Sequence, residues 1–133
     1  MQSGQRRTMT STQRFADALQ ELERTRSLDP FLELFSDEVQ LLRPEGRGDT
    51  RGKDGAARFW QTYLDQFEEI GSTFSRLAES GSLGELEWSG DGRLRTGRAV
   101  SYRGVSLLEL DEDGLVRRFA TYYDTAAFLV PLA

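Results

Sequence analysis

The chain contains neither cysteine nor histidine in its 133 residues. The absence of cysteine excludes disulfide bonds, thiol nucleophiles and thiolate metal ligands. The absence of histidine removes the most common general base and the most common zinc ligand. Any acid–base chemistry must therefore come from Asp, Glu, Tyr, Lys or Arg side chains, and we expect neither a metal site nor another cofactor.

Positive charge and long apolar runs are also scarce. The net charge of −5 argues against a nucleic-acid-binding surface, which would normally be basic. No apolar run approaches the ~20 residues of a membrane-spanning helix, and the polar residues 1–7 lack the hydrophobic stretch of a secretory signal. Length and composition, with 38% apolar and 29% charged residues, fit one soluble globular domain. We expect a cytoplasmic protein with no nucleic-acid or membrane partner.

The first half of the chain has the spacing of three helices and one strand. Residues 1–11 are polar and aperiodic, which predicts a disordered or frayed tail before a domain over residues 12–133. Thr12 and Asp29, the latter followed by proline, are typical helix starts. The expected elements are a helix from residue 12, a short helix from residue 29 with Phe31, Leu34 and Phe35 as its buried stripe, and a strand over 37–43. The longest helix is expected over 53–70, with an apolar face of Trp60, Tyr63, Leu64, Phe67 and Ile70 and an end at Gly71.

The second half has the alternation of an antiparallel sheet. Its expected strands cover residues 73–79, 83–89, 96–110 and 115–124, separated by turns at 80–82, 90–92 and 111–114. A last helical turn is expected over 125–129, with Asp124 in a capping rather than a catalytic role. Helices followed by a strand meander predict the α+β class, with the sheet wrapping the helices.

The last two strands carry apolar residues on both faces. One face presents Gly104, Ser106, Leu108, Phe119, Thr121 and Tyr123. The other presents Val105, Leu107, Val116, Ala120 and Tyr122. A sheet with one solvated face would alternate more cleanly between apolar and polar residues. We therefore expect the first face to line the interior and the outer face to be covered, most simply by a second copy of the chain in a homodimer.

Four segments together resemble the nuclear transport factor 2-like superfamily, particularly its SnoaL-like branch. They are LFSDEVQL at 34–41, GKDGAARFW at 52–60, GVSLLEL at 104–110 and DGLVRRFATYYD at 113–124. The resemblance covers about residues 12–130 and implies a cone-shaped α+β barrel, in which a curved, mostly antiparallel sheet wraps over three N-terminal helices. It also implies a deep pocket and usually a dimer. The superfamily includes ketosteroid isomerases, polyketide cyclases, limonene epoxide hydrolases, dehydratases and non-catalytic binding modules, so the fold does not decide the function.

The catalytic residues of two enzyme types on this fold have no counterparts here. Ketosteroid isomerases use an aspartate base, a tyrosine and a protonated aspartic acid, and the resemblance places these on Arg43, near Leu19 and on Ser106. Arginine stays protonated in proteins and cannot be the base. The Asp–Arg–Asp set of the epoxide hydrolases falls on Thr121 and on apolar positions of the third strand. A rearranged isomerase would need a buried carboxylate inside the cone, and no residue is a good candidate for it.

The side chains that remain suit a small-molecule site, which is an apolar cavity with a few convergent polar groups. The candidates for a ligand-binding pocket are Arg43, Trp60, Tyr63, Trp88, Ser106, Phe119, Thr121 and Tyr123. For Trp60 and Tyr63 the alternative is a purely structural place in the core. An inward-facing Arg43 would need an anion, because an unpaired buried charge is costly; otherwise it reaches solvent or pairs with a nearby acid. Glu85 and Glu87 fit a solvated strand face better than a catalytic pair.

The sequence therefore predicts a SnoaL-like protein that binds a small, largely apolar molecule in its cone. Turnover as an isomerase, cyclase or hydrolase would rely on Arg43, Tyr63 and Tyr123 for polarisation rather than on a strong base. The alternative is a non-catalytic dimerisation or interaction module that uses the outer face of the sheet. The sequence names neither the ligand nor a reaction.

Overall fold

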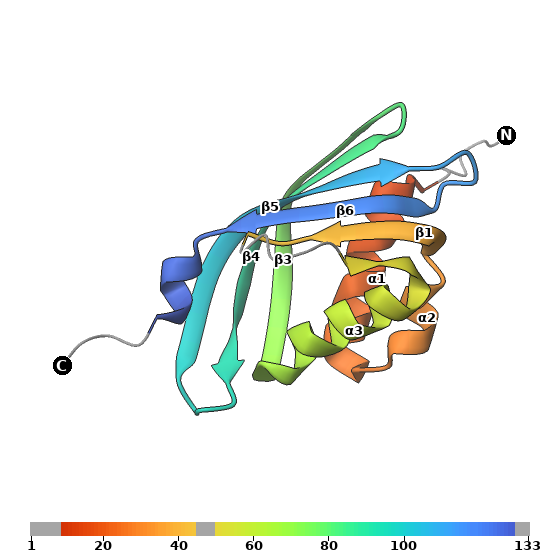
Figure 1. The fold of residues 1–133 in the computed structure, drawn as a ribbon. Coiled ribbons are helices and arrows are strands. Elements are labelled where there is room, and N and C mark those ends of the chain that lie inside the picture. Colours follow the sequence, from red (N-terminus) through yellow and green to blue (C-terminus); the bar gives the residue numbers. More distant parts are fainter. Residues whose placement is uncertain (1–8, 45–49, 130–133) are drawn as a thin grey trace, which may run out of the picture.

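A curved sheet carries three helices on its inner side in the computed structural model, which describes residues 9–44 and 50–129 (Figure 1). The helices are α1 (Ser11–Thr25), α2 (Leu28–Leu32) and α3 (Gly52–Asp65), with a short 3-10 helix, η1 (Thr125–Phe128), near the C-terminus. The strands are β1 (Phe35–Leu42), β2 (Thr50–Arg51), β3 (Phe67–Ser80), β4 (Leu83–Leu94), β5 (Ala99–Leu110) and β6 (Val116–Tyr123). None of the described helices is long and apolar enough to cross a membrane.

The six strands form one open sheet in the order β2-β1-β6-β5-β4-β3. All neighbouring strands are antiparallel except β1 and β6, which are parallel. The parallel pair places the strand of the helical half beside the last strand of the meander, and the sheet curves over α1 and α3 (Figure 1). The expected α+β class is confirmed, as a mostly antiparallel sheet that wraps over three helices without closing. The sequence does not predict the two-residue strand β2, which pairs with the end of β1.

Aromatic rings from the helices and the sheet meet in the main core. The ring centroid of Trp60 on α3 lies 4.9 Å from that of Phe31 and 5.1 Å from that of Phe119. Phe15 of α1 stacks on Phe119 at 5.6 Å, and Phe35, which opens β1 instead of lying on the second helix, meets Phe31 at 5.3 Å. All five side chains are at most 3% exposed. Such ring pairs contribute about 0.5–1.5 kcal/mol each beyond their buried area, so β6 is held firmly against α3.

Helix α1 begins one residue before its expected start. Its N-cap is Thr10, whose hydroxyl oxygen accepts a hydrogen bond from the N–H of Gln13 at 3.0 Å. Thr12, the predicted cap, is instead 1% exposed, and its N–H and hydroxyl both donate to Oε1 of Glu79 at 2.9 and 2.6 Å. Of the predicted tail, residues 1–8 lie outside the described residues, while Ser11 already belongs to the helix.

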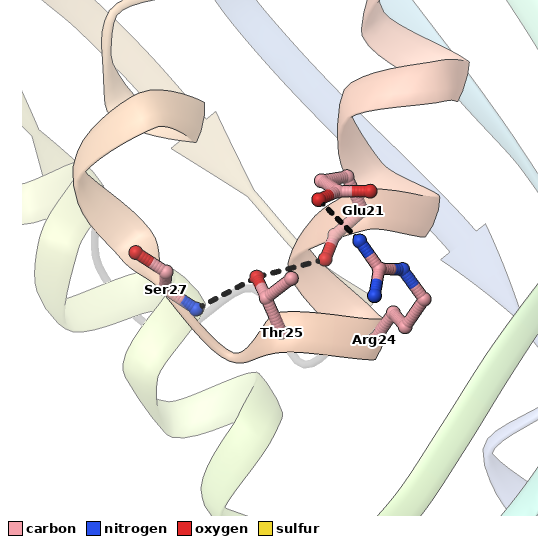
Figure 2. A network of polar contacts seen from close by, with 4 residues as sticks. All are labelled: Glu21, Arg24, Thr25 and Ser27. Atoms are coloured by element: carbon pink, nitrogen blue, oxygen red, sulfur yellow. Dashed lines mark hydrogen bonds and ion pairs between the residues drawn. The ribbon is translucent and has the colours of Figure 1, made fainter.

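Polar contacts at the end of α1 lead the chain into α2 (Figure 2). The hydroxyl of Thr25 donates to the carbonyl of Glu21 at 3.0 Å and accepts from the N–H of Ser27 at 3.2 Å. Arg24 adds an exposed ion pair with Glu21 at 2.6 Å. Ser27 stands at the N-cap position of α2, so this helix begins before the predicted cap, Asp29.

Helix α3 is shorter than predicted and is not the longest helix. It has 14 residues against 15 in α1 and ends at Asp65, so Phe67 and Ile70 lie on β3. A register shift against β4 directly after Phe67 places both apolar side chains in the interior, where they form a second core cluster with residues of β5. A bulge therefore produces a three-residue apolar spacing that imitates the period of a helix.

The predicted turn at residues 90–92 is a continuous part of β4. The chain turns later, near Gly97, whose φ of 96° favours glycine. Gly92 has a different purpose, because a Cβ at this position would clash with the carbonyl oxygen of Glu69 on the neighbouring strand. Glycine here permits a close approach of two backbones rather than a change of direction.

The faces of β5 and β6 divide nearly as the alternation predicts. Leu108 and Phe119 point inward and are at most 2% exposed, whereas Tyr122 on the outer face is 51% exposed. Two residues of the predicted outer face are buried: Ala120 is 0% exposed, and Val116, which a register shift at the end of β5 turns into the main core, is 2% exposed.

The close approach at Gly92 can be tested against a matched glycine on the neighbouring strand. We expect Gly92→Ala to lower the free energy of unfolding by about 1–3 kcal/mol, because the new methyl group overpacks the backbone of β3. Gly71→Ala is the control, since its Cβ would meet nothing within 4 Å. Urea denaturation of both variants measures the difference, and equal losses would contradict the packing role of Gly92.

Candidate functional site

A cavity of about 60 Å³ lies between the helices and the inner face of the sheet. All eight side chains predicted for a pocket line it: Arg43, Trp60, Tyr63, Trp88, Ser106, Phe119, Thr121 and Tyr123. The lining also includes six side chains that are not among the predicted pocket residues: Leu19, Phe59, Gln66, Ser72, Tyr102 and Phe128. The structure thus brings the predicted residues together around one space, while their role in ligand binding stays a prediction.

Aromatic rings close the cavity beside η1. The ring centroid of Phe128 lies 4.7 Å from that of Tyr102 and 5.9 Å from that of Tyr123. Helix η1 positions Phe128, and the carboxylate of Asp124 accepts a hydrogen bond from the N–H of Ala126 at 2.9 Å, so the predicted capping role is confirmed. Sequence reasoning misses Phe128 because one helical turn has no apolar period that would assign its side chain to the interior.

Two hydroxyl groups and an indole form a buried polar cluster on the sheet side of the cavity. The indole Nε1 of Trp88 donates to Oγ of Ser106 at 3.0 Å, and Oγ of Ser106 lies 2.9 Å from Oγ1 of Thr121. Ser106 and Thr121 are 5% and 8% exposed. These are the positions on which the resemblance places carboxyl groups of the enzymes, and neutral hydroxyls occupy them here.

Arg43 follows directly after β1 and lines the cavity while remaining partly exposed. Its guanidinium carbon lies 4.9 Å from the centroid of the Phe59 ring, a cation–π contact of about 0.5–1 kcal/mol at such a site. No acidic side chain of the described residues forms an ion pair with it. Of the predicted alternatives, a nearby acidic partner is therefore not found within residues 9–44 and 50–129.

A buried carboxylate that the sequence does not single out lies behind the cavity wall. Glu23 of α1 is 6% exposed. Its Oε2 accepts hydrogen bonds from the hydroxyl of Tyr63 and the hydroxyl of Ser72, both at 2.6 Å, and its Oε1 accepts the N–H of Ser72 at 2.8 Å. Tyr63 and Ser72 line the cavity and Glu23 does not, so a ligand could reach this carboxylate only through the two hydroxyls.

Burial has the largest effect on the pKa of Glu23. It raises the pKa of Glu23 above the ordinary value of 4.5, although the hydrogen bonds from Ser72 and Tyr63 act to lower it. Burial and the neighbouring charge of Glu23 raise the pKa of Tyr63 well above its usual range, and burial also raises the pKa of Tyr102. Both tyrosines are therefore neutral phenols at physiological pH.

The described lining contains no carboxylate that could act directly on a ligand. Glu85 and Glu87 are exposed on the outer face of β4, as the strand alternation predicts, and do not face the cavity. The arrangement is thus an aromatic enclosure with two separate polar clusters and one cation at its edge. These side chains can bind and orient a molecule. None of the described residues that line the cavity is a carboxylate that could act on it as a general acid or base.

Comparison with known proteins places this arrangement in a family. The family model for the SnoaL-like domain matches residues 12–119. No curated protein sequence matches the chain.

Solved structures with the same fold share little sequence with this chain. A nuclear transport factor 2-like protein of unknown function from Exiguobacterium is 21% identical, with a TM-score of 0.74 over 86% of this chain and 98% of its own. A Mycobacterium tuberculosis protein in complex with estradiol-17β-hemisuccinate is 14% identical, with a TM-score of 0.74 over 90% of this chain and 98% of its own. TerC, co-crystallised with polyporic acid, is 18% identical, with a TM-score of 0.76 over 90% of this chain and 95% of its own. At these identities the likeness concerns the fold.

The raised pKa of Glu23 makes stability depend on pH in a defined direction. Between the unfolded and the folded pKa the native state binds the proton more tightly, so stability is lost as pH rises from about 4.5. We expect the wild type to lose unfolding free energy relative to Glu23→Gln over this rise, because the variant has no proton to release. Urea denaturation of both proteins between about pH 4 and 8 measures the difference. A constant difference, or one that moves in favour of the wild type, would contradict the burial effect.

Proposed function

Because the chain belongs to the SnoaL-like domain family, we propose that it binds a small, largely apolar molecule in the cavity between α3 and the sheet. The observation that carries this proposal is a hollow interior enclosed by aromatic rings, with a few polar groups converging on it. Apolar cavities with a small number of placed polar groups are typical of small-molecule sites. Binding rather than turnover is proposed, because the described lining has no carboxylate at the ligand surface.

Structural relatives that were crystallised with small molecules support a binding role. The Mycobacterium tuberculosis protein and TerC were crystallised with estradiol-17β-hemisuccinate and polyporic acid, both ring compounds that carry oxygen atoms. The rings around the present cavity suit a ligand of that general kind, flat and largely apolar. Arg43 at the edge adds a preference for a ligand with an anionic group, since its charge has no acidic partner among the described residues.

The size of the cavity determines how a ligand enters. About 60 Å³ holds a few water molecules or a small fragment, and a multi-ring molecule needs more room. Phe128 is the side chain best placed to give way, because it is partly exposed and belongs to a four-residue helix at the end of the sheet. We expect η1 to shift outward when a larger ligand enters, while the rings of the main core stay in place.

The outer face of the sheet supports a second role, homodimerisation. Tyr122 is 51% exposed there, and Val105 and Leu107 beside it on β5 are partly exposed. Arg103 on β5 and Glu87 on β4 are exposed on the same face, so it carries charges of both signs around its apolar residues. A self-complementary patch of this kind suits a twofold pairing. The alternative of a purely non-catalytic interaction module would use this face without the cavity.

Filling the cavity tests the binding proposal. Leu19→Phe adds a ring to a lining position on α1 and reduces the free space, so we expect it to weaken the binding of small aromatic probes such as 4-ethylphenol by about tenfold. Isothermal titration calorimetry measures the affinity, and a thermal melt confirms that the variant folds. Leu83→Phe, at an exposed position of β4, is the control and should bind as the wild type does. Binding that is unaffected by Leu19→Phe would place the probe outside the cavity.

Charge on the outer face tests the dimer. We expect Tyr122→Glu to convert the protein from dimer to monomer at micromolar concentration, because a buried, unpaired carboxylate opposes association. Analytical ultracentrifugation gives the mass directly. Met9→Glu, which charges an exposed apolar residue away from the sheet, should leave the dimer intact. A monomeric wild type would contradict the dimer and leave the binding proposal untouched.

A further inference from the structure

The hydroxyls beside Glu23 have already used their hydrogens. Tyr63 and Ser72 each carry one hydroxyl hydrogen, and each donates it to Oε2 of Glu23 at 2.6 Å. A hydroxyl whose hydrogen is already donated can only accept further hydrogen bonds, through the lone pairs of its oxygen. Both residues line the cavity, so these two hydroxyls offer it acceptors and no donor.

The hydroxyls of Ser106 on β5 and Thr121 on β6 differ, because one of their two hydrogens is not used in a hydrogen bond. Trp88 Nε1, Ser106 and Thr121 together carry three polar hydrogens, and only two hydrogen bonds join them. Whichever of the two hydroxyls donates to the other, one hydroxyl hydrogen is left over, because the indole can only donate. No further hydrogen bond uses it among the described residues. This cluster therefore offers a donor to the cavity.

The two clusters lie at different levels of the sheet. Ser72 pairs with Gly90, and Gly90 pairs with Tyr102, so Ser72 is level with Tyr102 across neighbouring strands. Ser106 lies four residues further along β5 and faces the same cavity. At ~3.3 Å per residue the offset along the strand is about 13 Å. A ligand that touches both clusters must therefore be elongated.

We propose that the cavity is selective for an elongated molecule with a hydroxyl donor at one end, bound by the oxygens of Tyr63 and Ser72, and a carbonyl acceptor at the other, bound by the Ser106–Thr121 pair. This inference rests on the proposed binding function and adds the chemical class and orientation of the ligand. Gln66 and Tyr102 also line the cavity, but an amide and a phenol can both donate and accept, so these two side chains set no preference. Glu23 is a positioning residue, since it fixes the polarity of hydroxyls that touch the ligand without touching it.

Three matched probes separate the two ends. 4-Hydroxyacetophenone carries both groups, 4-methoxyacetophenone lacks the donor, and 4-ethylphenol lacks the carbonyl. We expect the full-length wild type to bind 4-hydroxyacetophenone about five- to tenfold more tightly than either of the others in calorimetric titrations, because each omission leaves one buried polar group unpaired.

Glu23→Gln should reverse the preference at the acceptor end. The N–H of Ser72 cannot reorient, so the amide oxygen of the new side chain takes the place of Oε1 and its NH₂ group that of Oε2. The hydroxyls of Tyr63 and Ser72 then accept from this NH₂ group and turn their own hydrogens toward the cavity. The variant should bind 4-methoxyacetophenone at least as tightly as 4-hydroxyacetophenone. Glu79→Gln is the matched control, because Glu79 also accepts hydrogen bonds from a neighbouring N–H and hydroxyl but lies outside the cavity lining.

Thr121→Val tests the donor end without a change of shape. It removes one hydroxyl of the pair and leaves Ser106 free to donate, so the preference for 4-hydroxyacetophenone over 4-ethylphenol should shrink by about twofold. Ser106→Ala with Thr121→Val removes both hydroxyls but frees the indole N–H of Trp88, so Trp88→Phe is added to remove that donor too. In this triple variant the preference for the carbonyl should vanish, while that for the hydroxyl over the methoxy probe persists. Thermal melts of each variant show that the protein is folded.

The possible results distinguish a failure of the proposed ligand preference from a failure of the proposed binding function. If none of the three probes binds and Leu19→Phe changes nothing, the binding function itself fails. If all three bind with equal affinity and Leu19→Phe weakens them all, the cavity binds small molecules but has no polarity, and the present inference is wrong. A preference that survives Glu23→Gln unchanged would overturn the positioning role of Glu23.

Discussion

The carboxylate of Glu23 is the point at which α1, α3 and β3 are tied together. It accepts the hydroxyl of Tyr63 from α3 and both polar groups of Ser72 from β3. An ionised group at this depth costs several kcal/mol if its partners move away, so the three elements must keep these groups within hydrogen-bonding distance. Rings of the main core, among them Trp60 and Phe119, also line the cavity, together with Tyr63 and Ser72 that Glu23 holds. The place of the cavity therefore follows from a polar constraint as much as from apolar packing.

The sequence predicts the fold where one period holds without interruption. Phe15, Leu19 and Leu22 mark the inner face of α1, and strict alternation separates Leu108 and Phe119 from Tyr122 on the last strands. It fails where the register shifts. Phe67 and Ile70 imitate a helix because a bulge in β3 brings both inward, and other shifts at the strand ends move boundaries in the same way. A bulge is defined by a partner strand far along the chain, so periodicity in one segment cannot reveal it.

The residues of the site likewise fall into those that periodicity in the sequence predicts and those that it does not. Its apolar wall and the Ser106–Thr121 pair follow from alternation on β5 and β6, and Trp60 and Tyr63 from helical spacing. Glu23 does not follow, although a signal exists: it stands four residues after Leu19, on the buried stripe of α1, where a charged residue is out of place. A lone carboxylate on an apolar stripe needs partners from elsewhere, and only the packed structure identifies them as Tyr63 and Ser72. Periodicity in the sequence does not reveal such contacts between residues that lie far apart along the chain.

A hydroxyl that is already paired within the fold is a more selective contact than a free one. A free hydroxyl rotates to donate to one ligand and accept from another, so it discriminates weakly. The hydroxyls of Tyr63 and Ser72 have lost that choice to Glu23, and a ligand that offers the wrong partner leaves a buried group unpaired at a cost of about 1–3 kcal/mol. In the proposed complex the aromatic wall would contribute affinity, whereas the hydroxyls paired with Glu23 would contribute selectivity. Burial disfavours the ionised form of Glu23, and the hydrogen bonds from Tyr63 and Ser72 that oppose this effect are the same bonds that fix the orientation of the two hydroxyls.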